Sequence, residues 1–326
     1  MRRTATVLIA CLCLHSFLSA SLFGQSSTFV PGSGSELTKI GDDFEDPNWL
    51  YIPNNPKSTE DIDEQQHTPI GKSKNGRWFE GIKRGHPDVV ERVETPPGGL
   101  PGSRGALLLQ SLYTGIPNRP SHTMHQEDFI ANVQYQLGGP IDISQAPSVT
   151  TRVFLPPIDQ WERRSGPHFA FRAALETDVP KFNPKKFFVS KKNKEEDGVY
   201  WPGLFIILDS KHETGKENDY AYFRVRADRN GGDIKGPQIT TTGWWTLGMS
   251  FSSDGQVHYY AKPGVEDLTE ADYITSQLPY GHSCERFRAF FFNVVNGDDG
   301  RSWTTPWVID DPKLFVLNGG RIASRR

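Results

Sequence analysis

Short runs rich in β-branched and aromatic residues recur along the chain, and clusters of glycine, proline, asparagine and aspartate separate them. Such runs are typical of strands. The predicted strands cover residues 106–113, 148–155, 168–175, 203–210, 220–227, 244–251, 256–262, 286–295 and 313–318. No long stretch repeats apolar residues with a helical period, apart from one candidate turn at 266–274. Many strands with few helices predict an all-β, antiparallel two-sheet sandwich.

One connection between these runs has a recognisable turn sequence. Residues 252–255 read Ser-Ser-Asp-Gly and lie between two predicted strands. Gly255 is free to adopt a positive φ, which tight hairpin turns require. We therefore expect a hairpin here.

The N-terminus has the pattern of a secretory signal peptide. Arg2 and Arg3 precede an apolar run that ends in small residues near position 24. The run is marginal for crossing a bilayer and has no basic residue after it, which disfavours a membrane anchor. We predict a signal peptide over 1–24 and a secreted, periplasmic or cell-surface protein.

The remaining chain divides by composition. Residues 25–40 are rich in serine and glycine and predict a flexible linker, while 41–317 contain no second linker and predict one β-sandwich domain. Residues 182–198 form a charged insertion that we expect to be an exposed loop. Residues 318–326 predict a loose tail.

Cysteine and charge narrow the class of protein. The leader holds two of the three cysteines, so only Cys284 would remain and no internal disulfide could form. Such a domain needs a large core or a bound ion for stability. The formal net charge of the chain is −3 at pH 7. Removal of the leader, which contains Arg2 and Arg3 but no acidic residue, would change the net charge to −5. This acidity, with no phosphate-binding or dinucleotide motif, predicts neither a nucleic-acid nor a nucleotide partner.

Acidic residues flank apolar ones near both ends of the domain, at 42–49 (DDFEDPNW) and 307–316 (WVIDDPKLFV). If these segments are strands, alternation would point Asp43 and Glu45 outward together and would do the same for Asp310. Neighbouring first and last strands would bring the carboxylates together. Several such oxygens suit Ca²⁺.

These two motifs resemble those of carbohydrate-binding jelly rolls and of the larger concanavalin A-like and laminin G-like sandwiches. In those families the ends lie side by side and a structural calcium often binds there. The resemblance implies a jelly-roll fold and matches Glu45 and Asp310 to the calcium ligands, with Asp43 and Asp311 beside them. The stretch 243–264 is similar to a laminin G-like hairpin. The alternative is that these acids are solvated strand ends without metal.

One predicted strand offers side chains suited to β-elimination. His258, Tyr260 and Lys262 share one face by alternation, and jelly-roll polysaccharide lyases look similar in offering these residue types. Arg224 and Arg226 share a face of another strand and could neutralise a uronate carboxylate. The candidate catalytic residues are His258, Tyr260, Lys262 and Arg224. The favoured alternative is an ordinary strand with a wet face.

Residues 58–66 (STEDIDEQQ) resemble the acidic motif of retaining sandwich glucanases, which places carboxylates in a cleft. The sequence departs from that motif, because Ile62 stands two residues after Glu60 and Gln65 takes the third acidic place. A solvated loop is the favoured interpretation.

The eight tryptophans suggest a sugar-binding surface, since sugar rings stack on indole. Trp201 and Trp303 lie in loop-like sequences. Trp244 and Trp245 are adjacent, so one should face the core and the other the opposite side of its sheet. We take Trp201, Trp245 and Trp303, with Arg226, as candidate ligand-binding residues, and expect most tryptophans to pack in the core.

The sequence thus favours a secreted polysaccharide-binding sandwich with one structural Ca²⁺. A polysaccharide lyase or glycosidase of the same fold is the first alternative. A non-catalytic structural or cell-surface interaction module is the second.

Overall fold

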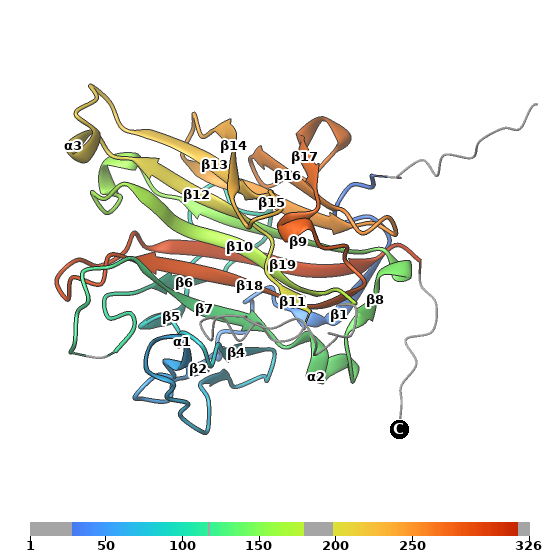
Figure 1. Ribbon diagram of the computed structural model, residues 1–326, viewed down its shortest axis with the longest axis horizontal. Helices are drawn as coiled ribbons and strands as arrows, with labels where there is room; N and C mark the ends of the chain where they lie inside the picture. The colour runs from blue at the N-terminus through green and yellow to red at the C-terminus, as the bar shows by residue number, and fades with distance from the viewer. Residues whose placement is uncertain (1–27, 117, 179–197, 319–326) are drawn as a thin grey trace, which may run out of the picture.

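A computed structural model describes residues 28–116, 118–178 and 198–318. The predicted signal peptide, most of the charged insertion and most of the predicted tail lie outside these residues. The described chain folds into two large antiparallel sheets that pack face to face (Figure 1). This confirms the expected two-sheet jelly-roll sandwich.

One sheet is eight-stranded. Its order is β17 (Tyr273–Gln277), β16 (Val257–Pro263), β15 (Gly243–Phe251), β9 (Pro147–Leu155), β19 (Trp307–Val316), β6 (Ala106–Gln110) and β5 (Val89–Val93), with β1 (Ser35–Gly41) paired to β19.

The other sheet is eleven-stranded. Its order is β14 (Asp233–Gln238), β13 (Tyr220–Arg226), β12 (Gly203–Asp209), β10 (Gly166–Glu176), β18 (Arg286–Asn296), β7 (His125–Ala131), β4 (Trp78–Glu80), β3 (Lys72–Ser73) and β2 (Tyr51–Ile52), while β11 (Val199–Tyr200) pairs with β10 and β8 (Ile141–Asp142) pairs with β18.

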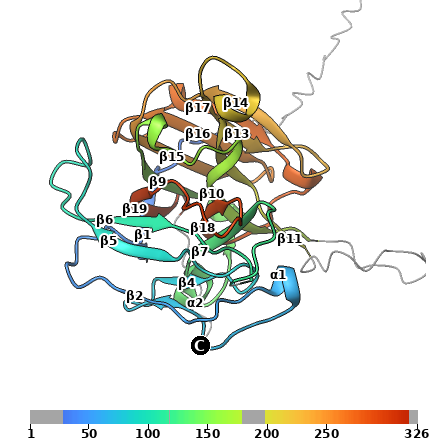
Figure 2. The same cartoon turned by 90° about the vertical axis from the view of Figure 1, so that its left-hand side faces the viewer.

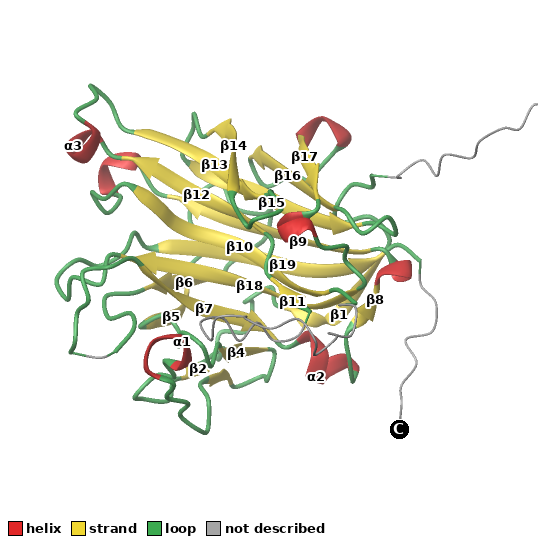
Figure 3. Cartoon of the chain, viewed as in Figure 1, coloured by secondary structure: helices red, strands yellow, loops and turns green. Residues whose placement is uncertain are grey.

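The helices are short and lie outside the two sheets (Figure 3). They are α1 (Glu60–Asp63), α2 (Val133–Leu137) and α3 (Lys211–Thr214), with single 3₁₀ turns at Ile143–Gln145, Ile158–Gln160, Glu270–Asp272 and Pro279–Gly281. Figure 2, turned by 90°, shows β5, β6 and β19 in one layer and β7, β18 and β10 in the other.

Each of the nine predicted strands corresponds to an observed one, with most ends shifted by a few residues, although β19 begins at Trp307 rather than at residue 313. The predicted hairpin is also confirmed, since Gly255 has a φ of 79° between β15 and β16. Alternation along the strands fills the space between the sheets with apolar side chains. Phe169 and Phe171 of β10, for example, face Trp307 and Leu314 of β19 within one continuous core.

The first and last strands are neighbours, as the acidic motifs predicted. β1 pairs antiparallel with β19, from Ser35 opposite Val316 to Gly41 opposite Lys313. This pairing corrects the predicted boundary of the linker, because the last residues assigned to it form β1.

The C-terminal acidic motif contains a bulge, which Pro312 permits because it cannot donate to a ladder. The register shifts between Asp310 and Lys313, and Asp311 has a φ of 51°. The bulge lies in the interior of the sheet, since β19 lies between β9 and β6.

The N-terminal acidic motif is not a strand. Residues 42–50 are irregular, and Phe44 has a φ of 53°. Its ring still enters the core, as expected, where it contacts Trp49 and Trp78 at centroid distances of 5.5 and 6.3 Å. Strand alternation therefore does not apply to the neighbouring acids, and Asp42 and Asp43 instead accept turn hydrogen bonds from the N–H groups of Phe44 and Glu45.

Candidate functional site

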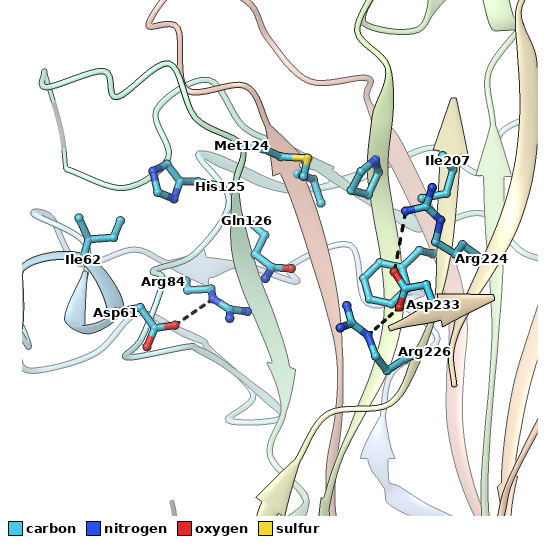
Figure 4. Close-up of a pocket in the computed structure, with 13 residues that line it drawn as sticks. Asp61, Ile62, Arg84, Met124, His125, Gln126, Ile207, Arg224, Arg226 and Asp233 are labelled. Atoms are coloured by element: carbon cyan, nitrogen blue, oxygen red, sulfur yellow. Dashed lines mark hydrogen bonds and ion pairs between the residues drawn. The ribbon is translucent and has the colours of Figure 1, made fainter. Parts of the chain in front are cut away.

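A groove with a volume of about 420 Å³ lies on the outer face of the eleven-stranded sheet (Figure 4). It is lined by Asp61, Ile62, Arg84, Met124, His125, Gln126, Pro167, Phe205, Ile207, Arg224, Arg226, Asp233 and Val295. We call it the outer-face groove.

Alternation on β13 places two of the lining arginines. Phe223 and Val225 point into the core between the sheets, so Arg224 and Arg226 point to the outer face. On the adjacent β12, Phe205 points outward by the same rule and joins a small apolar cluster separate from the main core. The sequence prediction that the two arginines share a face is confirmed.

One carboxylate serves both of these arginines. Asp233 of β14 lies 2.8 Å from Nε of Arg226 and 3.9 Å from Nη1 of Arg224. Burial raises the pKa of Asp233, although the two guanidinium groups act in the opposite direction. The pair of arginines therefore shares a single negative charge.

The opposite wall carries a second charged group. The Nε atom of Arg84 lies 3.1 Å from Oδ2 of Asp61 in α1, and its Nη1 lies 3.9 Å from Oδ1 of Asp128. Figure 4 shows this wall facing Arg226 and Asp233, with Gln126 between them. Burial raises the pKa of Asp128.

Arg172 of β10 lies beside these groups and is 5% exposed. It donates to Oδ1 of Asn293 at 3.1 Å and to the carbonyl of Trp201 at 2.7 Å. The rings of Phe205 and Phe291 both lie 5.3 Å from its guanidinium carbon. Burial, with Arg84 nearby, lowers the pKa of Arg172 to about 10.

Apolar side chains complete the groove. Ile62, Met124, Ile207 and Val295 line it beside His125. Met124 is 53% exposed. Apolar walls with a few converging polar groups are the usual composition of a ligand-binding site.

The structure does not bring the four candidate catalytic residues together. His258, Tyr260 and Lys262 belong to β16 in the eight-stranded sheet, whereas Arg224 belongs to the other sheet. His258 is buried between Ser252 and Ser276, at 2.6 and 2.5 Å. The four residues therefore do not form the expected shared active site. Strand alternation predicts which side chains share a face of one strand, but it does not predict which sheet contains that strand.

The β16 residues are also poorly suited to acid–base chemistry. Burial raises the pKa of Tyr260 to about 12, and burial lowers the pKa of His258. The ammonium of Lys262 donates to the carbonyl of Asp267 at 3.2 Å. These contacts indicate structural roles.

The tryptophans mostly pack in the core, as expected. Trp245 is 5% exposed and its ring lies 5.1 Å from Phe223 inside the sandwich, so it is not available as a sugar platform. Trp244 points to the other side of the same sheet. Trp201 is half-buried under the ammonium of Lys83, at 4.7 Å. Trp303 is 45% exposed and does not line the groove.

Two of the four expected calcium ligands approach the same hydroxyl group. Asp310 is 1% exposed and accepts from the Ser103 hydroxyl at 3.0 Å. Glu45 accepts from the backbone N–H groups of Arg104 and Gly105, and Ser103 also hydrogen-bonds to it. Burial raises the pKa of Asp310 to about 7, and Asp311 and Glu45 add to this.

The other two expected ligands are engaged elsewhere. Asp311 pairs with Arg152 at 3.1 Å and with Lys313 at 2.9 Å, and Asp43 accepts from the backbone N–H of Glu45 within a turn. Within 28–116, 118–178 and 198–318, no group of three or more histidine, cysteine or acidic residues could hold a metal ion. Of the four expected ligands, only Asp310 and Glu45 therefore share a hydrogen-bonding partner, the Ser103 side chain.

Several residues that line the groove, and Arg172 beside it, were not predicted from the sequence. Asp61 lies in the segment that we interpreted as a solvated loop, yet it lines the groove. Arg172 carried a usable signal, because it is a lone charge within the apolar run at 168–175. Arg84 and Gln126 carried none, since their roles depend on chain segments that only the fold brings together.

No family model matches the chain, and no curated protein matches it. Among solved structures, lectin II from Ulex europaeus is similar at 8% identity, with a TM-score of 0.35 over 83% of this chain and 100% of that one. An alginate lyase from Pseudomonas aeruginosa is similar at 8% identity, with a TM-score of 0.38 over 70% and 86%.

The Ca²⁺-bound exoplasmic/lumenal domain of VIP36 is similar at 11% identity, with a TM-score of 0.34 over 82% and 90%. The two-sheet antiparallel layout of this chain agrees with the expected concanavalin A-like sandwich. Function has to be argued from the groove itself, since similarities of this size carry nothing further.

In the part of the chain that the structure describes, none of the helices has the length and apolar character needed to cross a membrane.

Proposed function

We propose that this protein binds polysaccharide in the outer-face groove. The observation that carries the proposal is the composition of the groove, in which arginine, aspartate and glutamine side chains converge beside an apolar wall. Apolar surface can pack on the C–H faces of sugar rings, while the charged and amide groups can hydrogen-bond to hydroxyl groups.

The binding test uses the purified chain with a panel of soluble neutral and acidic polysaccharides, measured by isothermal titration. Gln126→Ala and Arg226→Gln alter the groove, and Lys39→Gln removes an exposed charge from β1 in the other sheet. We expect both groove variants to weaken binding and the control to leave it unchanged. Binding by the wild type that neither groove variant alters would contradict the proposed location.

A second candidate function is a polysaccharide lyase that acts in the same groove. The observation that favours it is that Arg224 and Arg226 lie across the groove from His125 and Gln126. Arginine can neutralise a uronate carboxylate, and histidine is a common general base. Ultraviolet absorbance of an unsaturated product during incubation with a polyuronate would support this activity, and intact polymer would argue against it.

We also propose a structural Ca²⁺ near the joined ends of the domain, with Asp310 and Glu45 as its side-chain ligands. A buried carboxylate needs a proton or a cation, and Asp310 has no ion pair among the described residues. Carboxylate and hydroxyl oxygens are suitable ligands for Ca²⁺. The ion would stabilise the described residues, in which Cys284 is a free cysteine and no disulfide joins the ends.

We propose secretion as the cellular context, on the basis of the leader sequence at 1–24. Recovery of the mature chain outside the cytoplasm, with its N-terminus read by peptide sequencing, tests this.

A further inference from the structure

The charges around the outer-face groove are unbalanced. Arg224 and Arg226 share Asp233, while Arg84 lies between Asp61 and Asp128. Arg172 then adds a guanidinium whose hydrogen-bond acceptors, Asn293 and the Trp201 carbonyl, are neutral. Four guanidinium groups thus face three carboxylates.

Arg172 is the strongest part of this imbalance. It is 5% exposed, and its Nε is buried with no hydrogen-bond partner among the described residues. A buried cation is stable only when an anion or hydrogen-bond acceptors compensate for lost water. Phe205 and Phe291 flank the guanidinium and offer only the weak attraction of their ring faces. An anion in the neighbouring groove would supply the missing compensation.

Two lysines extend the positive charge beyond the groove. The ammonium of Lys235 on β14 lies 4.2 Å from the ring centre of Tyr220 and 4.3 Å from that of Tyr222. Lys83 lies over Trp201 in the same way. Their ammonium groups sit on ring faces, and an approaching anion could still contact them.

The cations are spread across the strands rather than along one of them. Lys235, Arg226 and Arg172 lie on β14, β13 and β10, with β12 between the last two. Neighbouring strands lie about 4.8 Å apart, so three steps span roughly 14 Å. A row of this length exceeds one small ion and suits a chain that carries repeated negative charges.

We propose that the outer-face groove selects an acidic polysaccharide, with carboxylate or sulfate groups held by Arg226 and Arg224 and with the buried charge of Arg172 behind them. This inference rests on the proposed function and specifies its substrate class. A chain of net charge −3 repels a polyanion overall, so a local excess of cations on this face would confine binding to the groove.

The test measures affinity of the purified chain for a polyuronate, a sulfated galactan and a neutral glucan, each at low and high salt. We expect at least one acidic polymer to bind about tenfold or more tightly than the neutral one, with binding weakened by salt. The two acidic polymers distinguish carboxylate from sulfate recognition. Equal or tighter binding of the neutral glucan would overturn the inference and leave the proposed function standing, whereas no binding of any polymer would overturn both.

Two groove variants test whether the acidic polymer binds in the groove, and they should change its affinity in opposite directions. Arg226→Gln should weaken acidic-polymer binding about ten- to a hundredfold. Asp233→Asn should strengthen it, because it releases two arginines from their shared carboxylate. Misfolding cannot explain a gain in affinity. Lys39→Gln is the control for loss of one positive charge and should leave the affinity for both acidic and neutral polymers unchanged. A loss of affinity in Asp233→Asn with an unchanged melting temperature would contradict the inference.

Discussion

Asn293 connects a buried cation to a buried anion. Its amide oxygen accepts from Arg172 at 3.1 Å, and its amide nitrogen donates to Asp128 on the neighbouring strand. Asp128 in turn lies near Arg84 on the groove wall. The orientation of one amide therefore links the buried guanidinium to the charged wall and fixes the position of both relative to the sheet.

Asn293→Ala should destabilise the fold, because it removes a partner from two buried charged groups at once. We expect the free energy of unfolding to fall by about 1–3 kcal/mol, measured by chemical denaturation. Asn230→Ala changes an exposed loop residue and is the matched control. Equal stability of Asn293→Ala and the wild type would contradict the role of this amide.

Asp310 should make stability depend on pH. Burial raises its pKa in the folded state to about 7, from an ordinary value near 4. Between these values the folded chain holds a proton that the unfolded chain releases, so this contribution is complete below about pH 4 and is lost as pH rises to about 7. Asp310→Asn should remove up to about 4 kcal/mol of this loss in metal-free buffer. Parallel curves of stability against pH for the two proteins would rule out this titration.

If Asp310 and Glu45 bind calcium, the ion should oppose the loss of folding stability at neutral pH. We expect a chelator to lower the melting temperature at neutral pH, added Ca²⁺ to restore it, and Asp310→Ala to abolish the response. Asp43→Asn changes only a turn carboxylate and should keep the response. An unchanged melting temperature in wild type with chelator would argue against a structural ion.

Truncating two tryptophans should lower the free energy of unfolding by very different amounts. Trp245→Ala removes a core ring in contact with Phe223 and should cost about 3–5 kcal/mol of unfolding free energy. Trp303→Ala removes a ring that is 45% exposed and should cost less than about 1 kcal/mol. Denaturation curves of the two variants provide the measurement, and similar costs would contradict the assigned burial.

The fold could be predicted from the sequence because its strands are strongly patterned. Alternation correctly placed Arg224 and Arg226 on one face, and the acidic motifs correctly predicted that the ends pair. The acids of the first motif could not be oriented from sequence, because a positive φ at Phe44 interrupts strand geometry there.

The candidate site was harder to predict because residues on one strand face can be buried by segments far away in sequence. His258 illustrates this, since Ser276 of the neighbouring β17 helps to cover it. The groove instead combines Asp61 of α1 with Asp233 of β14. Only the fold brings these together. The glucanase-like resemblance of residues 58–66 did not indicate that Asp61 would meet Asp233, which belongs to no recognised motif.

Hydrogen–deuterium exchange with and without a bound acidic polysaccharide tests the location of binding most directly. We predict slower exchange in β12, in β13, in β14 and in the 58–66 segment, with no change in β15, β16 or β17. Protection confined to β15, β16 and β17, the region of the candidate catalytic residues His258, Tyr260 and Lys262, would contradict this location.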